Sequence, residues 1–296
     1  MRIVVSGASG LIGSPLVERL RRDGHDVVQL VRREPRAPHE VRWDPSSGDL
    51  DPAALEGVDA AINLSGAGAG DKRWTPEFKR VIRDSRVDST RTLATALAAS
   101  GPPPKVLLNA SAIGYYGDRG DEELTERSVA GDGFFVDVVV DWEAATRPAE
   151  DAGVRTVHLR SGLVMARKGG AFGRLFPLFR LGLGGKLGDG SMWWSWISLE
   201  DEVTAIVHLL THDVSGPVNL TGPRPVTNAE LTKALGRALH RPAPFAVPKG
   251  ALRAGLGEFA EEVTSSQRVL PHVLLDSGFA FTHTDVDSAC RWIAGR

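Results

Sequence analysis

Three glycines that follow a short apolar run near the start of the chain have a spacing suited to holding a phosphate group. The run at residues 3–5 precedes Gly7, Gly10 and Gly13, and apolar residues then recur at helical spacing over residues 16–20. Glycines allow a tight turn and a close approach of pyrophosphate, and the N–H groups that begin the next helix attract an anion. The Gly-x-x-Gly-x-x-Gly spacing alone also fits an ordinary turn. Its place directly after an N-terminal strand favours a dinucleotide site.

The residues that end the second apolar run indicate which dinucleotide binds. The run at residues 26–31 continues into Arg32 and Arg33. An NAD site usually carries an acidic residue there, which binds the ribose 2′-hydroxyl, whereas an arginine pairs with the 2′-phosphate of NADP. The sequence therefore predicts NADP as the cofactor. A solvated basic loop stays open as an alternative, because Arg36 follows and exposed charges need no partner.

Further polar residues and the only two tyrosines follow the later predicted strands. Apolar runs predict strands at residues 41–43, 59–63 and 105–111. The carboxyl ends of parallel strands meet at one edge of a sheet, where ligands bind. The candidate residues at this edge are Asp44, Asn63, Leu64, Ser65, Gly66, Ser111, Tyr115 and Tyr116.

Strands alternate with helical segments over the first half of the chain. This alternation predicts an α/β fold of the Rossmann type, a doubly wound parallel sheet. We expect residues 1–166 to form the NADP-binding domain, with residues 197–222 returning to its sheet, and one long helix over 134–152. Periodicity fades after residue 167. Residues 167–196 and 223–296 are therefore expected to form a smaller C-terminal substrate lobe.

The amino-acid composition limits the kinds of molecule that the protein is expected to bind. The net charge of −2 without a basic stripe argues against a nucleic-acid partner. Cys290 is the only cysteine, so we predict no internal disulfide and no cysteine-rich metal cluster, and packing is the expected role of this residue. We name no metal-binding residue. No apolar run is long enough to cross a bilayer, so we expect no membrane partner and a cytoplasmic location. A small molecule is the expected substrate, and a homodimer stays open.

Several motifs together resemble the extended short-chain dehydrogenase/reductase superfamily. The resemblance is closer to one atypical branch, the epimerase-family proteins related to sugar-nucleotide epimerases, and it covers essentially the whole chain. The matching segments are residues 6–13, 63–66, 73–75, 111–117, 184–188 and 196–201, and the tail segments 266–271 and 278–281 look like that branch's C-terminal extension.

The resemblance implies an NADP(H)-binding fold with a C-terminal lobe over the nicotinamide. It places Arg32 and Arg33 at the 2′-phosphate, Asp44 on the adenine side and Ser111 by the reactive ring. The segment from Asn63 to Gly66 would lie at the nearby ribose. The pyrophosphate would be held by Gly7, Ser9, Gly10, Leu11, Ile12 and Gly13.

The chain departs from the superfamily at the proton-transfer residues. A Tyr-x-x-x-Lys pair normally lies on the helix after the fifth strand, where the ammonium lowers the phenol pKa. In the corresponding register this chain has Phe135 and Val139, and Ala112 takes the usual serine position. Tyr115 and Tyr116 are the candidate substitutes for the proton donor, although packing is an alternative role for a phenol.

Two classes of function remain. The preferred hypothesis is an NADP(H)-dependent oxidoreductase or epimerase-like enzyme of atypical chemistry that acts on a small molecule. The alternative is a catalytically degraded NADP(H)-binding sensor or scaffold without turnover, which the missing tyrosine and lysine favour. A true sugar-nucleotide epimerase is less well supported, because the resemblance associates those enzymes with NAD and the tyrosine pair.

Overall fold

A parallel sheet of seven strands forms the centre of the protein. The computed structural model describes residues 1–295. All neighbouring strands of this sheet are parallel, in the order β12-β7-β5-β4-β1-β2-β3. This arrangement confirms the Rossmann-type fold class. The strands are β1 (Arg2–Ser6), β2 (Asp26–Val31), β3 (Glu40–Arg42), β4 (Ala60–Asn63), β5 (Val106–Ala112), β7 (Arg155–Ser161) and β12 (Gly216–Leu220).

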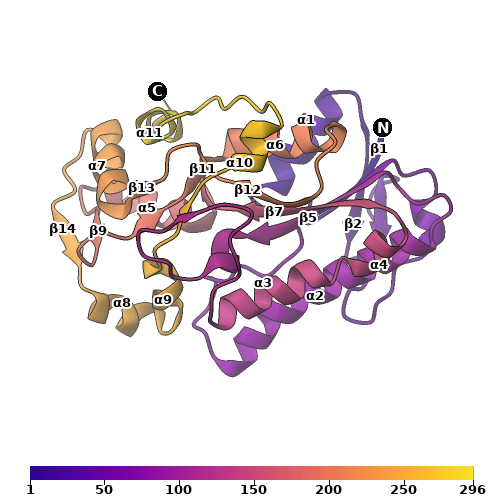
Figure 1. The fold of residues 1–296 in the computed structure, drawn as a ribbon, viewed down its shortest axis with the longest axis horizontal. Helices are drawn as coiled ribbons and strands as arrows, with labels where there is room; N and C mark the ends of the chain where they lie inside the picture. The colour runs from indigo at the N-terminus through magenta and orange to yellow at the C-terminus, as the bar shows by residue number, and fades with distance from the viewer. Residues whose placement is uncertain (296) are drawn as a thin grey trace.

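Helices cover both faces of the sheet, as Figure 1 shows. Successive side chains of a strand point to opposite faces. Ile3 and Val5 of β1 therefore pack in the core beneath α1 and α6, and Val4 packs on the other side, beneath α2. The sheet is therefore held between two apolar layers of side chains. The helices of the two layers are α1 (Gly13–Arg22) and α6 (Leu199–Thr211), and α2 (Pro76–Ala99), α3 (Phe134–Ala144) and α4 (Arg147–Asp151).

The single helix expected over residues 134–152 is wrong, because the structure divides it. α3 ends at Ala144 and α4 begins at Arg147. Pro148 explains the break, since proline lacks the N–H of a helical hydrogen bond and its ring collides with the carbonyl four residues earlier. Thr146 bridges the gap by donating its hydroxyl to the carbonyl of Glu143, at 2.7 Å. The apolar periodicity continues across the break, so it did not reveal the break.

Most of the C-terminal segments gather at the end of the sheet toward which β5 points (Figure 1), whereas Leu274 and Phe279 pack in the core of the sheet itself. Phe172, Phe176 and Phe179 form a separate core with Leu235 and Cys290. The burial of Cys290 confirms the packing role expected for this residue. The longer elements here are α5 (Gly170–Arg180), β9 (Gly185–Leu187), α7 (Asn228–Leu239), β14 (Phe245–Val247), α8 (Lys249–Leu256), α9 (Phe259–Thr264) and α11 (Val286–Ala294).

Short pairings tie the C-terminal segments to the loops of the sheet. β15 pairs with β6 in the loop after β5, and β11 pairs with β8 after β7. Among residues 1–295, no helix is both long and apolar enough to cross a membrane. The remaining elements are η1 (Pro52–Leu55), η2 (Ile113–Tyr116), β6 (Glu123–Leu124), β8 (Leu163–Met165), β10 (Trp193–Trp194), β11 (Trp196–Ser198), β13 (Val226–Thr227), β15 (Arg268–Val269) and α10 (His272–Asp276).

Candidate functional site

The glycine turn between β1 and α1 is too tight for side chains at two of its positions. Gly7 has φ +68°, and a Cβ atom built on it would lie 2.5 Å from the carbonyl oxygen of Leu64. A Cβ built on Gly13 would lie 2.1 Å from the carbonyl oxygen of Gly7. At Gly10 the corresponding distance is 3.2 Å, and its N–H donates to the carbonyl of Gly7. The turn therefore packs directly against the loop after β4, with backbone in place of side chains.

Where α1 begins, the N–H of Ser14 already donates to the carbonyl of Gly10 and Pro15 has no N–H, so the N–H groups of residues 11–13 are the ones open to a ligand. No side chain caps this end, and the first turn contains no acidic residue. Ser9 is exposed, and Ile12 is partly buried against the core. The side chain of Leu11 approaches Gly169 and Gly170, which begin α5. An uncapped helix start beside a glycine turn is a suitable place for a phosphate group.

The two arginines after β2 have different surroundings. Arg33 forms a bidentate ion pair with Glu40 of β3, with contacts of 2.6 and 2.8 Å. This pair, with the N–H of Arg36, lowers the pKa of Glu40 to about 2. Arg32 is exposed and makes no hydrogen bond or ion pair with another of residues 1–295. Of these two arginines, Arg32 is thus the available cation, whereas the charge of Arg33 is already compensated.

The side chains of Asp44 and Asn63 already have hydrogen-bond partners within the protein. The carboxylate of Asp44 accepts hydrogen bonds from the N–H and hydroxyl of Ser46, at 3.0 and 2.6 Å. The side chain of Asn63 is fully buried, accepts from Ser6 and donates to Thr90 and Asn109. Asn63 therefore holds neighbouring elements together, and the backbone of residues 64–66 is what reaches the glycine turn.

A buried ion pair between α3 and β7 lies close to the carboxyl end of β5. Glu143 of α3 and Arg160 of β7 form two contacts of 2.8 Å, and their side chains are only 13 % and 4 % exposed. Ser111 donates its hydroxyl to Glu143 at 2.6 Å. Arg160 and Ser111 hold the pKa of Glu143 below its ordinary value although burial acts in the opposite direction. The structure thus brings Ser111 into a charged network beneath the strand ends.

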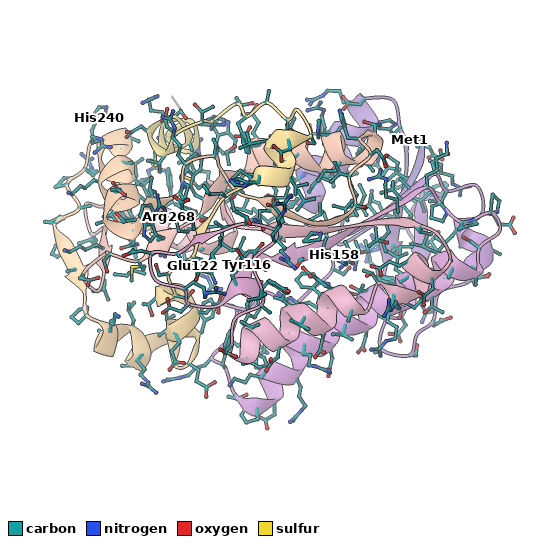
Figure 2. All side chains as sticks on the ribbon, in the orientation of Figure 1. Met1, Tyr116, Glu122, His158, His240 and Arg268 are labelled. Atoms are coloured by element: carbon teal, nitrogen blue, oxygen red, sulfur yellow. The ribbon has the colours of Figure 1, made fainter. Side chains whose placement is uncertain are left out.

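The two tyrosines occupy different environments beside this ion pair. Tyr116 is fully buried near the middle of the molecule (Figure 2), donates to Asn219 at 2.7 Å and accepts from Arg160 at 3.1 Å. Burial raises its pKa. Tyr115 is partly exposed, its ring covers the guanidinium of Arg160 at 3.5 Å, and its hydroxyl has no hydrogen bond to the described residues. Roles of Ser111, Tyr115 and Tyr116 in catalysis stay predictions.

Comparison with models of known protein families shows the family to which the chain belongs. The model of the NAD dependent epimerase/dehydratase family matches residues 3–221, which span the whole seven-stranded sheet. The chain belongs to this family. A second model, described as a domain of unknown function (DUF1731), matches residues 247–293. This second region contains α8, α9, α10 and all but the last residue of α11.

Relatives of this epimerase family match the full length of the chain. An epimerase family protein of Mycobacterium bovis, Mb2239, is 47 % identical over 99 % of this chain and 98 % of the relative. The human epimerase family protein SDR39U1 is 35 % identical over 99 % of both chains. A crystal structure of human SDR39U1 with NADPH has a TM-score of 0.93, at 34 % identity, over 100 % of this chain and 99 % of that chain.

The positions that the resemblance assigns to the tyrosine and lysine of the superfamily are apolar and packed. Val139 is fully buried. Phe135 is partly exposed, lies beside Trp74 with ring centroids 6.2 Å apart, and crowds Gly114 of η2. Arg86 of α2 is also near, 5.8 Å from the Phe135 ring centroid. Neither Phe135 nor Val139 can exchange a proton.

Replacing Tyr116 by phenylalanine tests whether this phenol is structural. We expect Tyr116→Phe to lower the free energy of unfolding by about 1–2 kcal/mol, because Asn219 and Arg160 each lose a buried hydrogen-bond partner. Nucleotide affinity is expected to stay unchanged. Denaturant unfolding and calorimetric titration measure the two quantities. An unchanged stability together with weakened binding would instead place the hydroxyl at the ligand.

Sequence reasoning missed two acidic residues of this region. Glu143 lies four residues after Val139, which is the spacing of neighbouring side chains on one helix face, and this spacing could have revealed it. Glu262 lies in the C-terminal tail, where no motif signalled it. Its position is evident only from the packing of α9.

Proposed function

We propose that this epimerase-family protein binds NADP(H) at the carboxyl ends of β1, β2 and β4 and uses it as an atypical oxidoreductase or epimerase-like enzyme on a small molecule. The observation that carries the preference for NADP is the uncompensated Arg32 at the end of β2, beside an Arg33 that Glu40 neutralises. The NADPH named with the human relative supports the same preference.

The residues present fit such a cofactor. Glycine at positions 7 and 13 lets the turn pack against the carbonyls of Leu64 and Gly7, and the N–H groups of residues 11–13, where α1 begins, are donors suited to a pyrophosphate. Arg32 supplies a planar group suited to the 2′-phosphate. Bound NADP(H) would supply or accept a hydride. The protein itself would orient the bound cofactor through the backbone of residues 7–13 and 64–66.

A protein that binds NADP(H) without turnover is the second candidate. The full burial of Val139 favours it, because a lysine at this position would place an ammonium in an apolar layer. In this candidate, cofactor occupancy would set the shape of the protein or its binding to a partner.

Calorimetric titration with NADPH and NADH tests the cofactor. We expect NADPH to bind about 30-fold more tightly than NADH, because one charge-assisted contact of the 2′-phosphate with Arg32 contributes about 2 kcal/mol. Equal affinities would refute the assignment of NADP, and binding of neither nucleotide would refute both candidate functions. If NADPH binds, a screen of carbonyl compounds, alcohols and sugar nucleotides for a change in NADPH absorbance separates the enzyme from the protein without turnover.

A further inference from the structure

The helix α9 of the C-terminal lobe docks beside the start of α3. The ring of Phe259 lies 5.4 Å from that of Trp74, between centroids, and its edge would be 2.9 Å from a Cβ built on Gly70. Glu258, just before α9, forms an ion pair with Lys79 of α2. These contacts hold α9 against the segment that joins β4 to α2, on the same side as Phe135.

One turn further along α9, Glu262 comes close to Phe135, the residue at the position that the resemblance assigns to the catalytic tyrosine. A Cβ atom built on Gly114 would lie 2.5 Å from Cδ1 of Phe135 and 3.4 Å from Oε1 of Glu262. Three segments that are remote in sequence therefore meet here: η2 after β5, the first turn of α3, and α9. Glu262 is the carboxyl group at this meeting point, next to the ring that replaces the phenol.

The carboxyl group of Glu262 has no hydrogen bond or ion pair with another of residues 1–295. Burial raises its pKa to about 7. The surrounding charged groups are engaged elsewhere or lie toward other elements. Three cations form ion pairs with other carboxylates: Lys79 with Glu258, Arg253 with Glu261, and Arg174 with Asp71. Arg86 donates hydrogen bonds to the carbonyls of Ala67 and Ile82. Arg73 lies against Gly257, and the ring of Tyr115 covers Arg160.

We propose that Glu262 is the acid–base residue of this protein and takes the place of the missing tyrosine. This inference rests on the proposed NADP(H)-dependent function. In carbonyl reduction, Glu262 gives its proton to the carbonyl oxygen while hydride from NADPH reaches the carbonyl carbon. The products are an alcohol, NADP⁺ and the Glu262 carboxylate, which then takes a proton from water. In the reverse direction, the carboxylate accepts the alcohol proton as hydride passes to NADP⁺.

Solvent contact distinguishes Glu262 from the other buried acid–base groups. Neither oxygen of Glu262 is sealed from solvent, so its proton can be replaced after each reaction. Glu202 also has a pKa raised by burial, to about 8, but Oε2 of Glu202 is sealed and Ser161 donates to its other oxygen. The hydroxyl of Tyr116 is bonded to Asn219 and Arg160. A general acid needs a suitable pKa and access to its substrate, and Glu262 combines the two.

The test measures the affinities of NADP⁺ and NADPH between about pH 6 and pH 8, which needs no substrate. A carboxylate that forms beside the nicotinamide attracts the cationic oxidised ring and not the neutral reduced ring. We therefore expect the preference for NADP⁺ over NADPH to rise about fivefold across this range in the wild type. The 2′-phosphate also titrates near pH 6, but it is common to both nucleotides and cancels in the ratio.

The variant Glu262→Gln keeps the shape of the side chain and removes its titration, so its affinity ratio should be constant with pH. Glu261→Gln is the matched control, because Glu261 is an exposed neighbour on the same helix and should reproduce the wild-type behaviour. A flat ratio in the wild type, or an unchanged pH dependence in Glu262→Gln, would overturn the inference while nucleotide binding stands. Failure of both nucleotides to bind would overturn the proposed function itself.

Discussion

Replacing Arg32 by alanine is expected to weaken NADPH binding about 30-fold and to leave NADH binding within about twofold of the wild type. The side chain is exposed and has no ion pair among residues 1–295, so its removal disturbs no internal contact. The loss corresponds to about 2 kcal/mol, the size of a charge-assisted contact with a phosphate group. Calorimetric titration of both nucleotides measures this difference.

Arg33→Ala is the matched control at the neighbouring position. Arg33 already forms a bidentate pair with Glu40, and we expect its removal to weaken NADPH binding by less than about threefold. Salt provides a second check, because a contact with the phosphate weakens as ionic strength rises. If Arg33→Ala lost the NADPH preference and Arg32→Ala kept it, the assignment of the two arginines would be reversed.

Replacing Glu143 by glutamine is expected to lower the free energy of unfolding by about 3 kcal/mol at neutral pH. The substitution keeps an acceptor for Ser111 but leaves the buried guanidinium of Arg160 without its counter-charge. Removing one partner of a buried ion pair typically costs about 3–5 kcal/mol. Denaturant unfolding measures the effect, and a loss below about 1 kcal/mol would contradict it.

The loss of stability caused by Glu143→Gln is expected to become smaller at low pH. The folded-state pKa of Glu143 lies below its ordinary value of 4.5, so the ionised carboxylate stabilises the fold fully above that value. The difference between wild type and Glu143→Gln should therefore shrink as the pH falls through the folded-state pKa. Asp141→Asn is the control on the same helix, because Asp141 pairs with Arg83 in an exposed position and should contribute about 0.5 kcal/mol or less.

The fold and the phosphate-binding turn could be predicted from the sequence because they depend on local patterns. Short apolar runs set the strands, and the glycines at 7 and 13 are required by backbone contacts within or beside the turn. The Thr-x-x-Glu pattern of Thr227 and Glu230 is another local signal, since it marks the start of α7 and both hydrogen bonds of a capping box are present there. The break after Ala144 was missed because apolar periodicity does not register a single proline.

Side-chain roles at the site depended on partners that are distant in the sequence. Arg32 and Arg33 look equivalent in the chain, and only the pairing of β2 with β3 places Glu40 on Arg33. The hydroxyls of Ser111 and Tyr116 are directed by Arg160 and Glu143, which come from β7 and α3.

The sequence by itself determined the Rossmann-type sheet, the place of the glycine turn, the basic strand end and the absence of the usual tyrosine and lysine. Only the tertiary structure decided which arginine is uncompensated, which hydroxyls are buried and that Glu262 stands beside Phe135. The physical reason is the range of the interactions involved. Turns and apolar periodicity act within a few residues of the chain, whereas charge compensation and burial arise where remote segments pack together.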